Sequence, residues 1–133
     1  MKIKKKVFVS ILIVLFVVIV AIIGAKAYIE ANLERLTDQT ISNVDLSKAK
    51  DGVYFGSCNA FPVAAEVEVI IDSHRIKEIK LKKHTNGQGS EAEIIPGKVV
   101  EAQTLEVDIV AGATYSSKVI LKAIEDALNQ ASR

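Results

Sequence analysis

The chain has 133 residues, which leaves room for one compact domain beside a membrane segment. Its 17 basic and 16 acidic side chains nearly cancel over the whole chain. Five of the basic side chains and one of the acidic ones lie in residues 1–30, so residues 31–133 hold twelve basic and fifteen acidic side chains, a net charge of −3. This acidic remainder, together with the lack of tryptophan, excludes nucleic acid as an expected partner.

Residues 7–25 contain no charged side chain and consist mostly of Val, Ile, Leu and Phe. As a helix they would span about 28 Å, close to the thickness of the hydrocarbon core of a bilayer. We therefore predict a single-pass anchor in the cell membrane over residues 1–28, with a cytoplasmic N-terminus and an extracytoplasmic domain. The orientation follows from four preceding lysines: Lys2, Lys4, Lys5 and Lys6. Ala25-Lys26-Ala27 leaves a cleaved signal peptide as the alternative, and both interpretations export the domain.

Residues 29–50 are expected to connect the anchor to the domain. Ile29, Leu33 and Leu36 recur at helical spacing, which predicts a short juxtamembrane helix or stalk. The polar stretch 42–50 is typical of a linker. Asp51-Gly52 is a turn signal, so we place the start of a single domain there, over residues 51–133.

The first half of that domain predicts antiparallel strands. Val53-Tyr54-Phe55 has strand composition, and apolar and polar side chains then alternate over residues 63–71. The turn Asp72-Ser73-His74 and a returning strand over 75–83 complete a β-hairpin. The lysines of the returning strand are expected on its solvated face.

The second half predicts helices. Ser90, with Glu93 three residues later, is expected to cap a helix that continues past Pro96. Residues 108–110 form a short apolar run and predict another strand. The amphipathic pattern of a C-terminal helix follows at Ile120, Ala123, Ile124, Ala127 and Leu128. The expected class is α+β: a small antiparallel sheet with packed helices, preceded by one transmembrane helix.

The stretch from Asp108 to Ser117 carries the chemistry. Small side chains at Ala111, Gly112 and Ala113 would let a bulky group approach the backbone. The amides at the start of the following helix favour a phosphate, and hydroxyls stand at the same end on Thr114, Ser116 and Ser117. Alternatively, these hydroxyls only cap the helix.

Other chemistry has less support. The single cysteine, Cys58, cannot form an intramolecular disulfide, and we expect a buried, inert thiol. His74 and His84 lack the partners of a metal site, so no metal is expected. The sequence contains no hydrolase or P-loop motif, and no catalytic residues are assigned.

Residues 51–130 resemble the FMN-binding domain family, which occurs in subunits of the sodium-translocating NADH:quinone reductase and of Rnf-type electron-transport complexes. The family pattern is Asp-x-x-(Ser/Thr)-Gly-Ala-Thr, and this chain matches it at Asp108, Gly112, Ala113 and Thr114, followed by Ser116 and Ser117. The resemblance implies that FMN is joined to Thr114 by a phosphoester bond, made by a separate magnesium-dependent flavin transferase. Ala111 departs from the pattern, which usually has Ser or Thr there.

The resemblance also suggests roles for other residues. Asp108 and Gly112 would shape the turn that the transferase recognises, and Ser116, Ser117 and the helix amides would hold the phosphate. His84, Gly87 and Gln88 belong to a glycine-bearing loop near the flavin ring. The expected function is an electron carrier between redox partners in the membrane or outside the cell. A non-covalent flavin-binding module and a structural module of a membrane redox assembly stay open as alternatives.

Overall fold

The structure, a computed structural model, describes residues 3–133. The chain divides into two compact units, one that ends at Asn32 and one that runs from Leu33 to Arg133. The long helix α1 (Ile3–Asp38) makes up the first unit and contributes its last residues to the second. By length and composition, its residues Lys4–Asp38 could cross a membrane, and its apolar side chains from Val7 to Ile23 are exposed.

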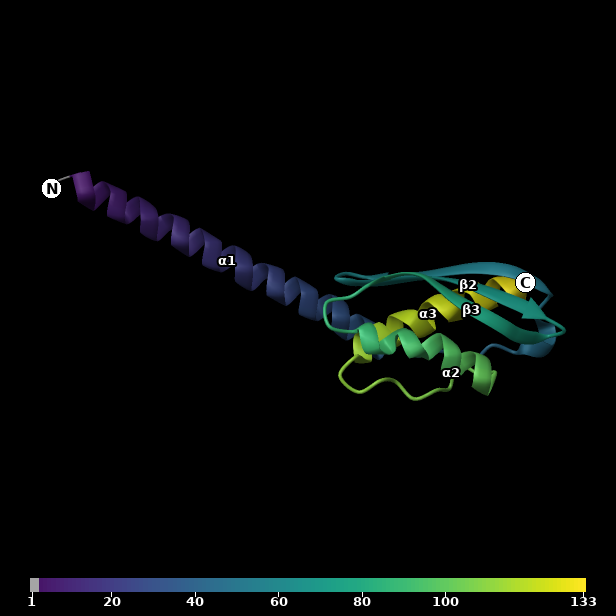
Figure 1. Ribbon diagram of the computed structural model, residues 1–133. Helices are drawn as coiled ribbons and strands as arrows, with labels where there is room; N and C mark the ends of the chain where they lie inside the picture. The colour runs from purple at the N-terminus through teal and green to yellow at the C-terminus, as the bar shows by residue number, and fades with distance from the viewer. Residues whose placement is uncertain (1–2) are drawn as a thin grey trace. The chain divides into compact units, whose positions relative to one another are not determined.

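The second unit contains a three-stranded antiparallel sheet in the order β1-β2-β3 (Figure 1). The strands are β1 (Gly52–Ala60), β2 (Val63–Asp72) and β3 (Arg75–Thr85), and β2 and β3 form the predicted hairpin. The predicted alternation is confirmed, because one face of β2 is buried throughout: Val63, Ala65, Val67, Val69 and Ile71. On the opposite face Glu68 pairs with Lys80 and Lys82.

Helices cover the buried face, which confirms the α+β class. The covering helices are α2 (Ile95–Ala102) and α3 (Thr114–Ala131). Two 3-10 helices, η1 (Leu46–Lys48) and η2 (Ser90–Ile94), lie in the connecting segments. α3 packs against β1 and β2, while α2 contacts β3 and α3 (Figure 1). The amphipathic pattern of the C-terminal helix is confirmed, since Ile120, Ala123 and Ile124 are fully buried.

Gly56 sets the distance between α3 and β1. A Cβ at this position would overlap the carbonyl oxygen of Ala123 and would lie 2.6 Å from the amide nitrogen of Ala127. Because these are backbone atoms of α3, the strand can approach the helix this closely only without a side chain. The contact holds α3, and with it the start of the helix at Thr114, against the sheet.

Residues 33–50, predicted as stalk and linker, take part in the core of the second unit. Leu36 and Ala49 are buried there. Lys118 and Lys122 of α3 donate to the carbonyl oxygens of Thr37 and Thr40. The nearly buried carboxylate of Glu125 accepts from the amide of Ser42 at 2.9 Å. The segment that follows α1 is thus fastened along α3.

Two predictions about local structure are wrong. Residues 108–110 form no strand, and the side-chain amide of Gln103 bonds both the N–H and the C=O of Ile76 on β3. Val110 instead bonds locally with the start of α3. Ser90 does not cap a helix, since Gly89 takes the cap position of η2 and makes no side-chain hydrogen bond.

Candidate functional site

A cavity of about 230 Å³ lies where the loop after β3 meets the start of α3. The two segments are more than twenty residues apart in sequence, and the first residue of β2 completes the lining. The lining residues are Val63, Gly87, Gln88, Gly89, Gly112, Ala113, Thr114, Tyr115 and Ser116. None of them is charged at neutral pH, so a bound anion would meet hydrogen-bond donors without a carboxylate to repel it.

The backbone at the start of α3 presents donors to this cavity. Ala111 and Gly112 form a turn in which Gly112 has φ +80°, a conformation that favours glycine. Ala113 follows as the cap residue and makes no side-chain hydrogen bond. The first bond of the helix runs from the amide of Ser117 to Ala113, at 2.9 Å. Over residues 3–133, no acceptor serves the preceding amides of Thr114, Tyr115 and Ser116, and such amides bind anions.

Glycines bring the two walls of the cavity together. A Cβ at Gly89 would overlap Oγ of Ser116 and would lie 2.7 Å from its Cβ. At Gly87 and Gly112, by contrast, an added Cβ would meet no atom within 4 Å. Gly89 therefore allows close packing of the loop on α3, while the other two leave the cavity mouth open.

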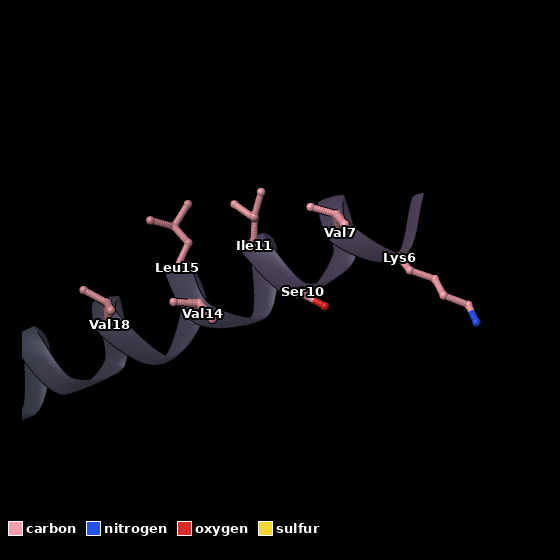
Figure 2. Close-up of a pocket in the computed structure, with 7 residues that line it drawn as sticks. All are labelled: Lys6, Val7, Ser10, Ile11, Val14, Leu15 and Val18. Carbon is pink, nitrogen blue, oxygen red and sulfur yellow. The ribbon is translucent and has the colours of Figure 1, made fainter. Parts of the chain in front are cut away.

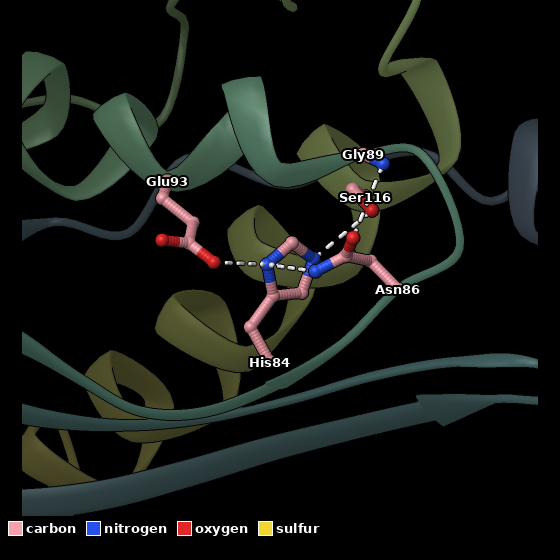
Figure 3. Close-up of polar contacts among 5 residues, drawn as sticks. All are labelled: His84, Asn86, Gly89, Glu93 and Ser116. Atoms are coloured by element: carbon pink, nitrogen blue, oxygen red, sulfur yellow. Dashed lines mark hydrogen bonds and ion pairs between the residues drawn. The ribbon is translucent and has the colours of Figure 1, made fainter.

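A hydrogen-bonded group built on His84 ties the loop to α3 (Figure 3). The His84 side chain is only 2% exposed. Its Nε2 lies 3.0 Å from Oγ of Ser116, and its Nδ1 lies 3.0 Å from a carboxylate oxygen of Glu93. Asn86 places its amide nitrogen 3.2 Å from Nδ1 and accepts from the amide of Gly89. The imidazole thus connects the loop, η2 and α3.

The structure brings six of the predicted site residues to the cavity: Gly87, Gln88, Gly112, Ala113, Thr114 and Ser116. His84 lies directly behind Ser116. Ser117 is fully buried, and its Oγ accepts from the amide of Val110 at 3.0 Å. Ala111 and Asp108 are exposed outside the cavity lining, and Asp108 borders a separate surface hollow with Lys98 and Glu106.

Sequence reasoning missed several residues of the site. Gly89 and Tyr115 stood next to predicted positions, but their roles depend on the three-dimensional contact between loop and helix. Glu93 was interpreted as part of a helix cap and instead binds His84. Val63 was recognised only as a core residue, and no signal in its local sequence points to a cavity.

A second hollow, of about 510 Å³, runs along one side of α1 from Lys6 to Val18 (Figure 2). Its lining is mostly aliphatic, and the two exceptions are Lys6 and Ser10. A single helix cannot enclose a ligand, so we interpret this hollow as the groove that normally lies between the side chains on the surface of an apolar helix.

Comparisons with known proteins identify a family for this chain. The family model described as the FMN-binding domain matches residues 62–129, which include the cavity lining. An uncharacterized protein of Treponema pallidum (strain Nichols) is 29% identical over 103 residues. The match covers 75% of this chain and 29% of that protein, so the chain spans less than a third of the relative's length.

Proposed function

This chain belongs to the FMN-binding domain family and takes FMN as its cofactor, and we propose that Thr114 carries the FMN through a phosphoester bond. One observation supports the proposal above the others. The Thr114 hydroxyl lines a cavity at the uncapped start of α3, where the unpaired amides can receive a phosphate.

The residues of the cavity fit the phosphate end of the cofactor. Three glycines give room for close approach, and the unpaired backbone amides at the start of α3 supply donors. The volume of about 230 Å³ is below the ~300–1,000 Å³ of typical small-molecule pockets. We infer that the lining residues would hold the phosphate and adjoining atoms of the cofactor.

In this proposal Thr114 Oγ1 forms the ester to phosphorus and loses its proton. Because a free phosphate is a poor electrophile, the flavin must arrive with its phosphate on a leaving group, which calls for a separate flavin transferase. Asp108 is exposed beside the turn and is available for recognition by that enzyme. When bound, the FMN supplies one- and two-electron redox chemistry, while the chain orients it.

The attachment is tested by intact mass after co-expression with a flavin transferase. The wild type should gain one FMN less one water. Thr114→Val keeps the β-branched shape but lacks the oxygen, so it should fold and show no covalent flavin. Thr40→Val, at an exposed threonine in the segment after α1, is the matched control and should be labelled normally. In-gel flavin fluorescence that persists in Thr114→Val would contradict the assignment.

A non-covalent flavin module is the second candidate, and Ala111 is the observation that favours it. The position usually carries a hydroxyl in the family, and here it is an exposed alanine in the turn before Thr114. If FMN binds but is lost on denaturation, Ala111→Ser should restore covalent attachment. A chain that binds no flavin under any condition would instead be a structural module.

We propose that the flavin domain acts as an electron carrier held at the outer surface of the membrane by α1. A membrane redox partner would supply electrons, and another carrier or an extracellular acceptor would receive them. Photoreduced, flavin-loaded protein should be reoxidised by a quinone or a one-electron acceptor without NADH, since the chain contains no nicotinamide motif. A flavin that stays reduced with every such acceptor would contradict the carrier role.

The lysines that precede α1 support a cytoplasmic N-terminus. Protease added to intact cells should therefore digest the unit from Leu33 to Arg133, and a tag at the N-terminus should be protected. Protection of the domain until the membrane is broken would reverse the proposed orientation. Release of the whole domain into the medium would show that the segment is a cleaved signal.

A further inference from the structure

The imidazole of His84 has a defined hydrogen-bonding pattern. A carboxylate can only accept, so the 3.0 Å contact with Glu93 places a proton on Nδ1 of His84. The amide nitrogen of Asn86 lies 3.2 Å from the same nitrogen, and because an amide N–H can only donate, it makes no hydrogen bond with the protonated Nδ1. The oxygen of Asn86 cannot replace it, since that oxygen accepts from the amide of Gly89. In the neutral ring Nε2 is then an acceptor.

This pattern fixes the direction of the Ser116 hydroxyl. At 3.0 Å from Nε2, the Ser116 O–H donates to the neutral imidazole (Figure 3). A hydroxyl has one proton to donate, so Ser116 presents only lone pairs to the cavity that it lines. Lone pairs repel a phosphate oxygen, and the neutral state of His84 therefore opposes anion binding at this position.

We propose that His84 and Glu93 are positioning residues that turn the Ser116 hydroxyl toward the cofactor phosphate, with one proton taken up by His84. The proton enters from water at Nε2, which becomes a donor to Ser116 Oγ. The Ser116 proton is then released from the imidazole and donates to the phosphate. No bond to carbon or phosphorus changes and nothing is oxidised. The result is a chain from the Glu93 carboxylate through the imidazolium and Ser116 to the phosphate.

Four elements place groups around the imidazole. Among the described residues, η2 contributes the carboxylate of Glu93, the loop contributes uncharged Asn86, α3 contributes Ser116, and β2 presents Ala65 opposite His84. The side chain of Glu93 is 51% exposed, so its charge is partly screened. The cavity lining has no lysine or arginine, so a protonated His84 would place a positive charge directly behind the lining residue Ser116.

The inference rests on the proposed attachment of FMN at Thr114, and NMR titration of the histidines in the detergent-solubilised full chain tests it. The sequence has two histidines, and His74 is an internal reference because the length of β3 separates the two by about 30 Å. On flavin attachment the titration midpoint of His84 should rise by about one pH unit or more, as expected for a charged form gaining an opposite charge and an acceptor. The midpoint of His74 should not move.

Variants separate the hydrogen-bonded chain from a through-space effect of charge. In flavin-loaded Ser116→Ala the rise at His84 should fall to less than half, and Ser116→Thr, which keeps a hydroxyl, should restore it. Glu93→Gln should also reduce the rise, because it removes the carboxylate that stabilises the imidazolium. An equal rise in wild type and Ser116→Ala would overturn the proposal.

The two proposals fail in distinguishable ways. A wild type whose intact mass lacks FMN despite an active transferase refutes the attachment at Thr114. A wild type that carries FMN, with a His84 midpoint unchanged from the flavin-free protein, refutes only the role of His84. Both outcomes are read on the same preparation.

Discussion

Replacing Gly89 by alanine should separate the loop from α3. The added Cβ would overlap Ser116 Oγ, and Ser116 is only 3% exposed, so its side chain cannot move into solvent. Forcing a methyl group into such a contact costs about 1–3 kcal/mol, and moving Ser116 away from His84 loses a hydrogen bond that contributes about 0.5–1.5 kcal/mol. We expect the free energy of unfolding to fall by about 1.5–4.5 kcal/mol, which at about 4–8 °C per kcal/mol lowers Tm by at least about 6 °C in a unit of this size.

Thermal unfolding of the detergent-solubilised full chain, followed by far-UV circular dichroism, measures this change. Gly87→Ala is the matched control, because Gly87 lies in the same loop and a Cβ there would meet no atom within 4 Å. The control should unfold within a few degrees of the wild type. A Gly89→Ala variant as stable as Gly87→Ala would refute the close packing of the loop on Ser116.

Three further predictions concern the fold. In urea unfolding, Gly56→Ala should destabilise the chain by about 3 kcal/mol, at the upper end of overpacking costs, because backbone atoms of α3 must move. Gly97→Ala is the control: the position lies in open space within α2, and the substitution should stabilise the chain by about 0.5–1 kcal/mol. Burial raises the pKa of the Cys58 thiol, so alkylation at pH 8 should be slower in the native chain than in urea, and Cys58→Ala should keep its flavin. A hydrogen bond from Lys80 lowers the pKa of Glu68 below its ordinary value of 4.5. The ionised Glu68 therefore stabilises the fold at neutral pH, and this stabilisation is lost as the pH falls through the lowered pKa. Glu68→Gln should lose less stability than the wild type between pH 6 and pH 3.

The hairpin and the C-terminal helix could be predicted from the sequence because each depends on a local pattern. The alternation from Val63 to Ile71 matches the two-residue period of a strand with one buried face. The spacing of Ile120, Ala123 and Ile124 matches the helical period in the same way. In both elements, the side chains that the pattern predicts to face the core are the ones that the structure buries.

The errors arose where distant residues decide the structure. Asp108, Ile109 and Val110 have the composition of a short strand, but a strand needs a free edge to pair with. Gln103 adopts a left-handed conformation at the end of α2 and directs its amide to the edge of β3. No pattern within residues 108–110 reveals that a side chain bonds the backbone of Ile76 on this edge.

The candidate site also contains both kinds of residue: some are adjacent in sequence, and others meet only in the folded chain. The turn at Gly112 and the helix start at Thr114 are contiguous in sequence, and the match of Asp108, Gly112, Ala113 and Thr114 to a family pattern identified them. The tie between His84 and Ser116 joins residues 32 positions apart. Its position behind the cavity wall depends on how the end of β3 packs over α3, which the sequence of either segment alone does not specify.

The two serines that follow Thr114, Ser116 and Ser117, are neighbours in sequence but have different roles in the structure. Successive residues of a helix point about 100° apart, so Ser116 and Ser117 cannot face the same partner. Ser117 points inward and accepts from the amide of Val110, which closes the turn that positions Thr114. Ser116 lines the cavity and contacts His84. Ser117→Ala should therefore destabilise the turn while the contact between Ser116 and His84 stays in place, and in the proposed chain of hydrogen bonds it is Ser116 that links the imidazole to the phosphate.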